Sequence, residues 1–171
     1  IDVAVLSGVI RDEGRAAMKT FVGAKRRFDF QLKSPNLVFI DDYAHHPQEL
    51  TASIRSIRQL YPDRKVTGVF QPHLYTRTRD FADDFAQSLS LLDDVILLDI
   101  YPAREEPIPG ITSGVIFDRI TSKEKVLLKK AELLDFLENK ELDVLVTLGA
   151  GDIEHLLPAI KQLLEKKSIG K

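Results

Sequence analysis

The sequence contains no cysteine, so disulfide bonds and thiolate chemistry are excluded, and this absence fits a reducing compartment. It has no apolar run near the ~20 residues that span a bilayer, and no basic-then-apolar leader is recognisable. The formal net charge is only −2, which gives no general reason to expect a nucleic acid or a membrane surface as partner. A cytoplasmic location is the resulting expectation.

Two phosphate-binding loops are also missing. No G-x-x-x-x-G-K-[ST] pattern occurs, so if the protein handles ATP, another domain must hold the phosphates. The glycine-rich stretch "GAGD" (149–152) is not G-x-G-x-x-G, and it follows the last apolar run rather than the first. A dinucleotide fingerprint is therefore disfavoured, and a plain tight turn is as good an interpretation as a ligand-binding loop.

The composition itself is that of a globular protein. The chain has 171 residues, of which 44% are hydrophobic and 29% charged, so it can bury one substantial core. Short apolar runs alternate with longer amphipathic ones, and the runs are nearly continuously apolar, as in parallel strands covered on both faces. The predicted strands are 37–41, 65–70, 94–100, 125–130 and 143–148.

Helical stripes lie between these strands. Apolar residues recur at helical spacing in 50–61, 81–92 and 153–164, where Pro158 predicts a kink or a late start. Pro47 suits a first helical position, and Thr78 is expected to cap a helix that begins at Arg79. The alternation predicts an α/β fold, a doubly wound Rossmann-like sheet of about six mostly parallel strands with helices on both faces.

The first part of the chain differs. The turn signal Ser34-Pro35-Asn36 predicts a hairpin of 27–33 with 37–41, which adds one antiparallel edge strand. Residues 1–22 contain two short helical pieces, 3–8 and 12–21, and are too few to form a core. We expect 1–22 to be the tail of a preceding domain and a hinge, and 23–171 to be a domain of its own.

Polar clusters follow four of the strands. They are "DDYAHHP" (41–47), "QPHLYTRTR" (71–79), "YPAREEP" (101–107) and "GAGD" (149–152). In open α/β sheets ligands bind at the carboxyl ends of the strands, so the shared placement of these clusters predicts a ligand site. His45, His46 and His73 all fall on this edge. A zinc site of His45, His73 and Asp42 is disfavoured, because its spacing matches no familiar pattern.

The arginines allow two interpretations. Arg77 and Arg79 are either surface charges or a planar clamp for a carboxylate or phosphate. Arg27 opens the strand that pairs with the one ending at Asp42, so the two residues should lie at the same end of the hairpin. An arginine and a carboxylate held close can bind a phosphate and a sugar diol, or can form an ion pair.

Five segments together resemble the C-terminal domain of the Mur ligases. They are "GAKRRFDF", "DDYAHHP", "FQPHLYTRTRDFADDF", "YPAREEPIPG" and "LGAGDI", and they cover the chain from about Gly23 to the final helix. The resemblance is greatest to the members that add L-alanine. It implies that ATP, with Mg²⁺ held mainly by a central domain, phosphorylates UDP-N-acetylmuramate to an acyl phosphate, which the amine of L-alanine attacks in peptidoglycan precursor synthesis.

The resemblance also implies roles for individual residues. Arg27 would meet the nucleotide near its phosphates and Asp42 would accept bonds from the ribose hydroxyls. The amino acid would lie among Tyr43, His45, His73 and Arg77, with His45 or His73 orienting the amine as the catalytic imidazole. Leu74 departs from the arginine of many relatives and leaves more weight on Arg77. No metal ligand is assigned to this chain.

The resemblance implies further partners and leaves alternatives open. The domain would close over its own N-terminal and central domains about Gly23 and Ala24, and alone it is expected to be inactive. Within the family, a ligase that joins a tripeptide to UDP-N-acetylmuramate is the alternative, although "QPHLYTRTR" favours the single amino acid. A nucleotide-binding module without catalysis is the alternative from another class.

Overall fold

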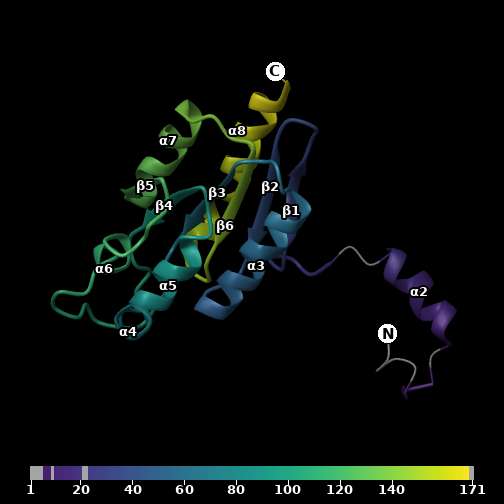
Figure 1. Cartoon of the computed structure of the whole chain (residues 1–171), viewed down its shortest axis with the longest axis horizontal. Coiled ribbons are helices and arrows are strands. Elements are labelled where there is room, and N and C mark those ends of the chain that lie inside the picture. Colours follow the sequence, from purple (N-terminus) through teal and green to yellow (C-terminus); the bar gives the residue numbers. More distant parts are fainter. Residues whose placement is uncertain (1–5, 9, 21–22, 170–171) are drawn as a thin grey trace.

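The computed structural model describes residues 6–8, 10–20 and 23–169, and its centre is a six-stranded sheet (Figure 1). The strands lie in the order β1-β2-β6-β3-β4-β5. The β1–β2 pair is antiparallel and all other neighbours are parallel, which confirms the predicted fold and its antiparallel edge. The strands are β1 (Asp29–Lys33), β2 (Val38–Asp42), β3 (Val66–Phe70), β4 (Asp94–Leu98), β5 (Glu124–Leu128) and β6 (Val144–Leu148).

Helices cover both faces of this sheet. One face carries α3 (Pro47–Leu60), α5 (Ala82–Leu89) and α6 (Gly114–Phe117), and the other carries α7 (Leu133–Asn139) and α8 (Leu157–Ile169). Two 3₁₀ turns, η1 (Lys130–Glu132) and η2 (Asp152–Leu156), lead into α7 and α8, and the short α4 (Tyr75–Asp80) follows β3. Alternate strand residues therefore enter two separate cores: Val38 and Ile40 face α3, whereas Phe39 faces α8.

Two of the predicted helix starts are confirmed. Pro47 is the first residue of α3, and His46 before it is the extended N-cap residue of a capping box completed by Glu49. Helix α8 begins only at Leu157, so Pro158 marks a late start rather than a kink.

The predicted start of the helix after β3 is wrong. Helix α4 begins at Tyr75, four residues before the expected Arg79, and Phe81 separates it from α5. Thr78 is buried within α4, where its hydroxyl donates to the carbonyl of Leu74, so it does not cap a helix. Leu74, at the N-cap position, has φ of 73° and makes no side-chain cap.

The strand register aligns the carboxyl ends of the three central strands. Asp42 of β2 and Phe70 of β3 both lie opposite Leu148 of β6. The hairpin, with a register shift between Phe30 and Leu32, brings the chain before β1 to the same edge. There the amide of Tyr43 donates to the carbonyl of Arg26 at 2.7 Å.

The segment before the sheet has a different character. Helix α2 (Arg11–Thr20) has no buried residue and lies apart from the sheet in Figure 1. It accounts for the predicted helical piece 12–21 except Phe21, which lies outside the described residues, as do residues 3–5 of the piece 3–8. The boundary at residue 22 stays a prediction. None of the helices in the described ranges is long and apolar enough to cross a membrane.

Phe85 tests the core on the α3 face. Its side chain is fully buried and its ring centroid lies 5.3 Å from that of Phe70. Phe85→Ala should lower the free energy of unfolding by about 3–5 kcal/mol, because it removes apolar contacts and leaves a cavity. Urea unfolding measures the loss. Gln87→Ala, at an exposed position of the same helix, is the control, and an equal loss in both variants would contradict this account of the core.

Candidate functional site

Four predicted site residues form one continuous row at the carboxyl edge. The ring centroids of Tyr43 and His45 lie 5.2 Å apart, and those of His45 and His73 lie 6.3 Å apart. One guanidinium nitrogen of Arg77 lies 3.5 Å from Nδ1 of His73. Segments that follow β2 and β3 thus bring the predicted amino-acid group together.

His45 is held by its neighbours at the start of α3. Its Nδ1 lies 3.0 Å from the carbonyl oxygen of Tyr43, and the carboxylate of Glu49 accepts the backbone N–H groups of His45 and His46. Because a carbonyl can only accept, the bond places the ring proton on Nδ1. In the neutral imidazole the Nε2 atom of His45 is then left as an acceptor.

His73 has the opposite arrangement. A guanidinium can only donate, so the Arg77 contact makes Nδ1 of His73 the acceptor and leaves the proton on Nε2. Burial, then the charge of Arg77 and then that of His45 lower the pKa of His73, which keeps the imidazole neutral at neutral pH. Its ring stacks on that of Tyr101, with 5.7 Å between the ring centroids. The sequence predicted only that the cluster after β4 lies at the site, and did not single out Tyr101.

Arg27 and Asp42 line a shallow hollow of about 360 Å³ beside α3. The two carboxylate oxygens of Asp42 accept from the amide of Ala44 at 3.0 Å and from the hydroxyl of Ser53 at 2.8 Å, rather than from Arg27. Arg27 is exposed, and its guanidinium carbon lies 5.7 Å from the centroid of Tyr43. Tyr43 therefore stands between the two groups of predicted site residues.

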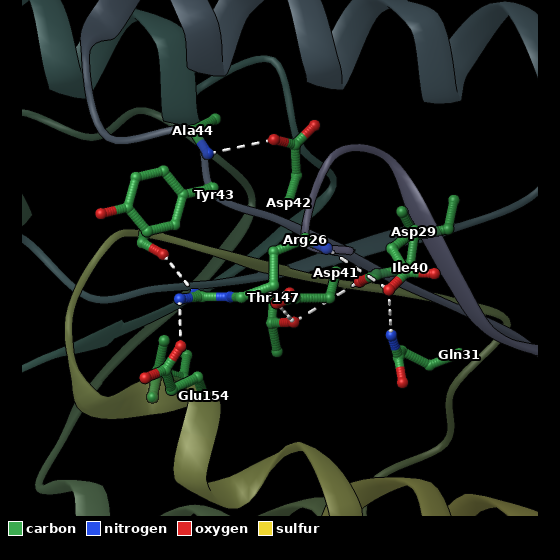
Figure 2. Close-up of polar contacts among 12 residues, drawn as sticks. Arg26, Asp29, Gln31, Ile40, Asp41, Asp42, Tyr43, Ala44, Thr147 and Glu154 are labelled. Carbon is green, nitrogen blue, oxygen red and sulfur yellow. Dashed lines mark hydrogen bonds and ion pairs between the residues drawn. The ribbon is translucent and has the colours of Figure 1, made fainter. Parts of the chain in front are cut away.

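Arg26 is the residue that sequence reasoning missed (Figure 2). Its guanidinium donates to Asp41 at 3.1 Å, to Glu154 at 2.7 Å and to the carbonyl of Gly149 at 2.7 Å. It also lies 4.9 Å from the ring centroid of Tyr43, and its backbone takes a φ of 58°. One side chain thus ties the hairpin to the end of β6 and to η2.

Asp41 is the buried partner of this arginine. It is fully buried, and it accepts from the hydroxyl of Thr147 at 2.7 Å as well as from Arg26. Burial raises the pKa of Asp41, while the Thr147 hydroxyl and the Arg26 charge act in the opposite direction. The period of two in a strand could have shown that Asp41 and Asp42 point to opposite faces of the sheet.

The "GAGD" turn is a close-packed turn. Gly149 has φ of 132°, and a Cβ there would lie 2.7 Å from the carbonyl oxygen of Gln71. A Cβ on Gly151 would lie 2.3 Å from the side-chain oxygen of Gln71, whose amide nitrogen donates to Asp152. The glycines are explained by contact with Gln71, directly after β3, so the turn needs no phosphate to account for it.

No cluster of three or more His, Cys, Asp or Glu side chains that could hold a metal ion occurs in the described part of the chain. Asp42 is bonded to Ser53 and Ala44, and it does not join His45 and His73 as a ligand set.

These features define a class of protein. A doubly wound α/β domain presents a row of titratable side chains at the carboxyl ends of its parallel strands, which is where such sheets bind small ligands. The sequence model of the family described as "Mur ligase, glutamate ligase domain" matches residues 26–151. The chain belongs to this family.

Relatives extend the comparison. The chain is 58% identical over 165 residues to the UDP-N-acetylmuramate–L-alanine ligase of Parabacteroides distasonis, covering 96% of this chain and 36% of the relative. The solved ligase of the same name from Thermotoga maritima matches with a TM-score of 0.78 and 26% identity, over 100% of this chain and 36% of that one. A murein peptide ligase from Psychrobacter arcticus has a TM-score of 0.66 at 22% identity over 87% of this chain and 32% of its own, which shows the shared fold. The chain thus spans about 36% of the length of the curated relatives.

The Arg26–Asp41 pair can be tested by a double-mutant cycle. Arg26→Met should cost about 3–5 kcal/mol of unfolding free energy, because it leaves the buried carboxylate of Asp41 without its cation. Adding Asp41→Asn should restore much of that loss, since the uncompensated charge is then gone. Urea unfolding of the four proteins measures the coupling, and losses that simply add would refute it.

The titration of His73 gives a second test. Because its pKa is lowered, protonation favours the unfolded chain, and the stability that the neutral ring contributes is lost as the pH falls below 6.5. Arg77→Gln should move the pKa of His73 upward, toward 6.5, by removing a neighbouring positive charge. NMR titration of the imidazole Cε1–H measures it. Arg79→Gln, at an exposed position on the same helix, should leave the titration unchanged.

Proposed function

We propose that the chain serves in an ATP-dependent ligase that joins L-alanine to UDP-N-acetylmuramate in peptidoglycan precursor synthesis. The observation that carries the proposal is the row of Tyr43, His45, His73 and Arg77 in a domain 58% identical to an enzyme of that name. The chain would bind the amino acid and complete one side of the ATP site. The cytoplasmic location expected from the sequence stays a prediction.

The amino-acid side of the site suits a small zwitterion. Arg77 can take the carboxylate of alanine with a charge-assisted hydrogen bond, and the Nε2–H of His73 can donate to the same group. Once the ammonium of alanine has lost a proton to solvent, the Nε2 acceptor of His45 can bind the amine and orient its lone pair toward the acyl phosphate. Attack on the acyl carbon forms the C–N bond, and the tetrahedral intermediate collapses by breaking the C–O bond to inorganic phosphate, while a second amine proton passes to solvent.

The nucleotide side is supported by the hollow at Arg27. A guanidinium and a carboxylate, Asp42, line one depression there, which fits a phosphate and a sugar diol. The family uses ATP, which supplies the phosphoryl group that activates the substrate carboxylate. The described residues offer no metal-ligand cluster, so we assign no Mg²⁺ ligand and no metal-dependent step to this chain.

Closure over the rest of the enzyme would bring the reactants together and exclude water from the acyl phosphate. Gly23 has φ of 85° and Ala24 is exposed, which suits the proposed hinge. Leu74, where the family resemblance implies an arginine, adds no positive charge, so Arg77 carries the carboxylate contact. The alternative, a ligase that joins a tripeptide, is supported by the similarity of this fold to that of the murein peptide ligase.

Arg77 is the first residue to change. In the full-length enzyme Arg77→Ala should raise the KM for alanine, because it removes a hydrogen bond to a charged group that is worth about 1.5–3 kcal/mol. Arg79→Ala, two residues further along α4, is the matched control, because Arg79 is exposed and paired with Asp80 at 2.7 Å. Steady-state phosphate release measures both, and an unchanged KM for alanine would remove Arg77 from the site.

The proposed reaction is tested by phosphate release from the full-length enzyme with ATP and UDP-N-acetylmuramate. Alanine, serine, glycine and the tripeptide are compared as acceptors. Alanine should give the highest kcat/KM, although one methyl group is worth only about 1–3 kcal/mol of discrimination. Turnover with the tripeptide but not with alanine would favour the tripeptide ligase alternative. Phosphate release that no acceptor stimulates would reject the ligase assignment.

A further inference from the structure

The loop 99–107 after β4 carries a motif that the proposed function does not use. Its residues Tyr101 and Glu105 contact the segment 73–77, which bears His73 and Arg77. We propose that Tyr101 and Glu105 are positioning residues that hold His73 and helix α4 in the geometry that binds the amino acid. The amino-acid part of this inference rests on the proposed function.

Helix α4 has no cap from its own sequence. Leu74 occupies the N-cap position without a side-chain hydrogen bond to the free N–H groups of the first turn. Glu105 supplies the missing acceptor from another loop: its carboxylate accepts the amide of Thr76 at 2.9 Å and also the hydroxyl of Thr76. Thr76 directly precedes Arg77, so this carboxylate fixes the turn that carries the proposed alanine ligand.

The backbone at Leu74 needs a second support. Its φ of 73° with ψ of 136° lies in a region that side-chain-bearing residues rarely adopt. The amide of Leu74 donates to the carbonyl of Tyr101 at 3.0 Å, and the amide of Tyr101 donates to the carbonyl of Pro72 at 2.8 Å. These bonds form an isolated parallel bridge between His73 and Tyr101, which continues the β3–β4 pairing past the strand ends.

The ring of Tyr101 supports His73 directly. The two rings stack at 5.7 Å with an angle of 29° between their planes. Behind it, a Cβ on Gly151 would lie 2.8 Å from the Cβ of Tyr101, so the tyrosine backbone is packed closely against the glycine turn. His73 therefore has Tyr101 on one side and Arg77 within 3.5 Å, and its ring plane is set by both.

Glu105 keeps its charge in this role. Hydrogen bonds from the Thr76 hydroxyl and amide lower the pKa of Glu105, so the carboxylate is ionised throughout the neutral range. Its neighbour Glu106 is exposed. The chain thus offers two adjacent glutamates of which one braces α4, and this makes a matched pair for mutagenesis.

The experiment uses the full-length enzyme with Glu105→Ala and Glu106→Ala. Glu105→Ala should raise the KM for alanine about tenfold, as expected for loss of a helix cap, with kcat and the KM for ATP little changed. Glu106→Ala should match the unmutated enzyme. Hydrogen exchange followed by mass spectrometry should show faster exchange in a peptide covering 75–80 in the Glu105→Ala variant alone.

Tyr101 is tested in the same way with a conservative variant. Tyr101→Ala should raise the KM for alanine, whereas Tyr101→Phe, which keeps the stacked ring, should restore most of the affinity. Equal rises in the KM for alanine and for ATP would indicate a general structural loss and overturn the inference.

Unchanged hydrogen exchange in 75–80 of the Glu105→Ala variant would overturn the proposal that Glu105 holds α4, whatever the effect of the substitution on activity. If the unmutated enzyme shows no alanine-dependent phosphate release, the proposed function fails, and the amino-acid role of these residues fails with it. The exchange measurement then still decides whether Glu105 holds α4. The failures of the two proposals are therefore distinguishable.

Discussion

The buried carboxylate of Asp41 and the guanidinium of Arg26 form the interaction on which the site depends. Asp41 is the fully buried penultimate residue of β2, and burying its charge is costly unless a cation that makes further hydrogen bonds lies beside it. Arg26 satisfies this condition by donating also to Glu154 and to Gly149, which come from the far end of the chain. Because burying the two charges costs about as much as their attraction returns, the pair adds little net stability. It does fix where the hairpin meets β6, and hence where Arg27 and Tyr43 lie.

The proposed amino-acid side has a different support. His45 follows β2 directly and is oriented by backbone groups and by Glu49, whereas Arg77 is carried by a helix of six residues whose cap comes from Glu105. Both cases use a glutamate to satisfy free N–H groups at a helix start. His45 and His73 lie in the loops that directly follow β2 and β3, and Arg77 lies in the short helix after β3, so the sheet sets their positions.

Much of the fold could be predicted because it follows local rules. Nearly continuous apolar runs become strands, of which β3, β4 and β6 are buried on both faces, Pro47 starts a helix, and a Ser-Pro-Asn turn makes the antiparallel edge. The start of α4 could not be predicted, since its cap lies 29 residues away in Glu105 and its first turn follows a strained Leu74. Arg26 was missed for the same reason: its partner Glu154 is 128 residues distant, and spacing carries no signal of such a contact. The residue types of the candidate site could be recognised in the sequence, but the contacts that hold them in place could not.

Tyr43 joins the two sides of the site. Its ring lies 4.9 Å from the guanidinium of Arg26 and 5.7 Å from that of Arg27, and on the other side it meets His45 at 5.2 Å. Cation–π contacts of this kind favour one ring orientation, because the ring face must turn toward the charge. A shift of the hairpin would therefore be felt at His45 through one rigid ring, whereas a shift of α4 would act on His73 through Tyr101. The proposed nucleotide and amino-acid groups thus have separate supports, and both supports reach the 149–152 turn, where Arg26 donates to the carbonyl of Gly149 and Tyr101 packs against Gly151.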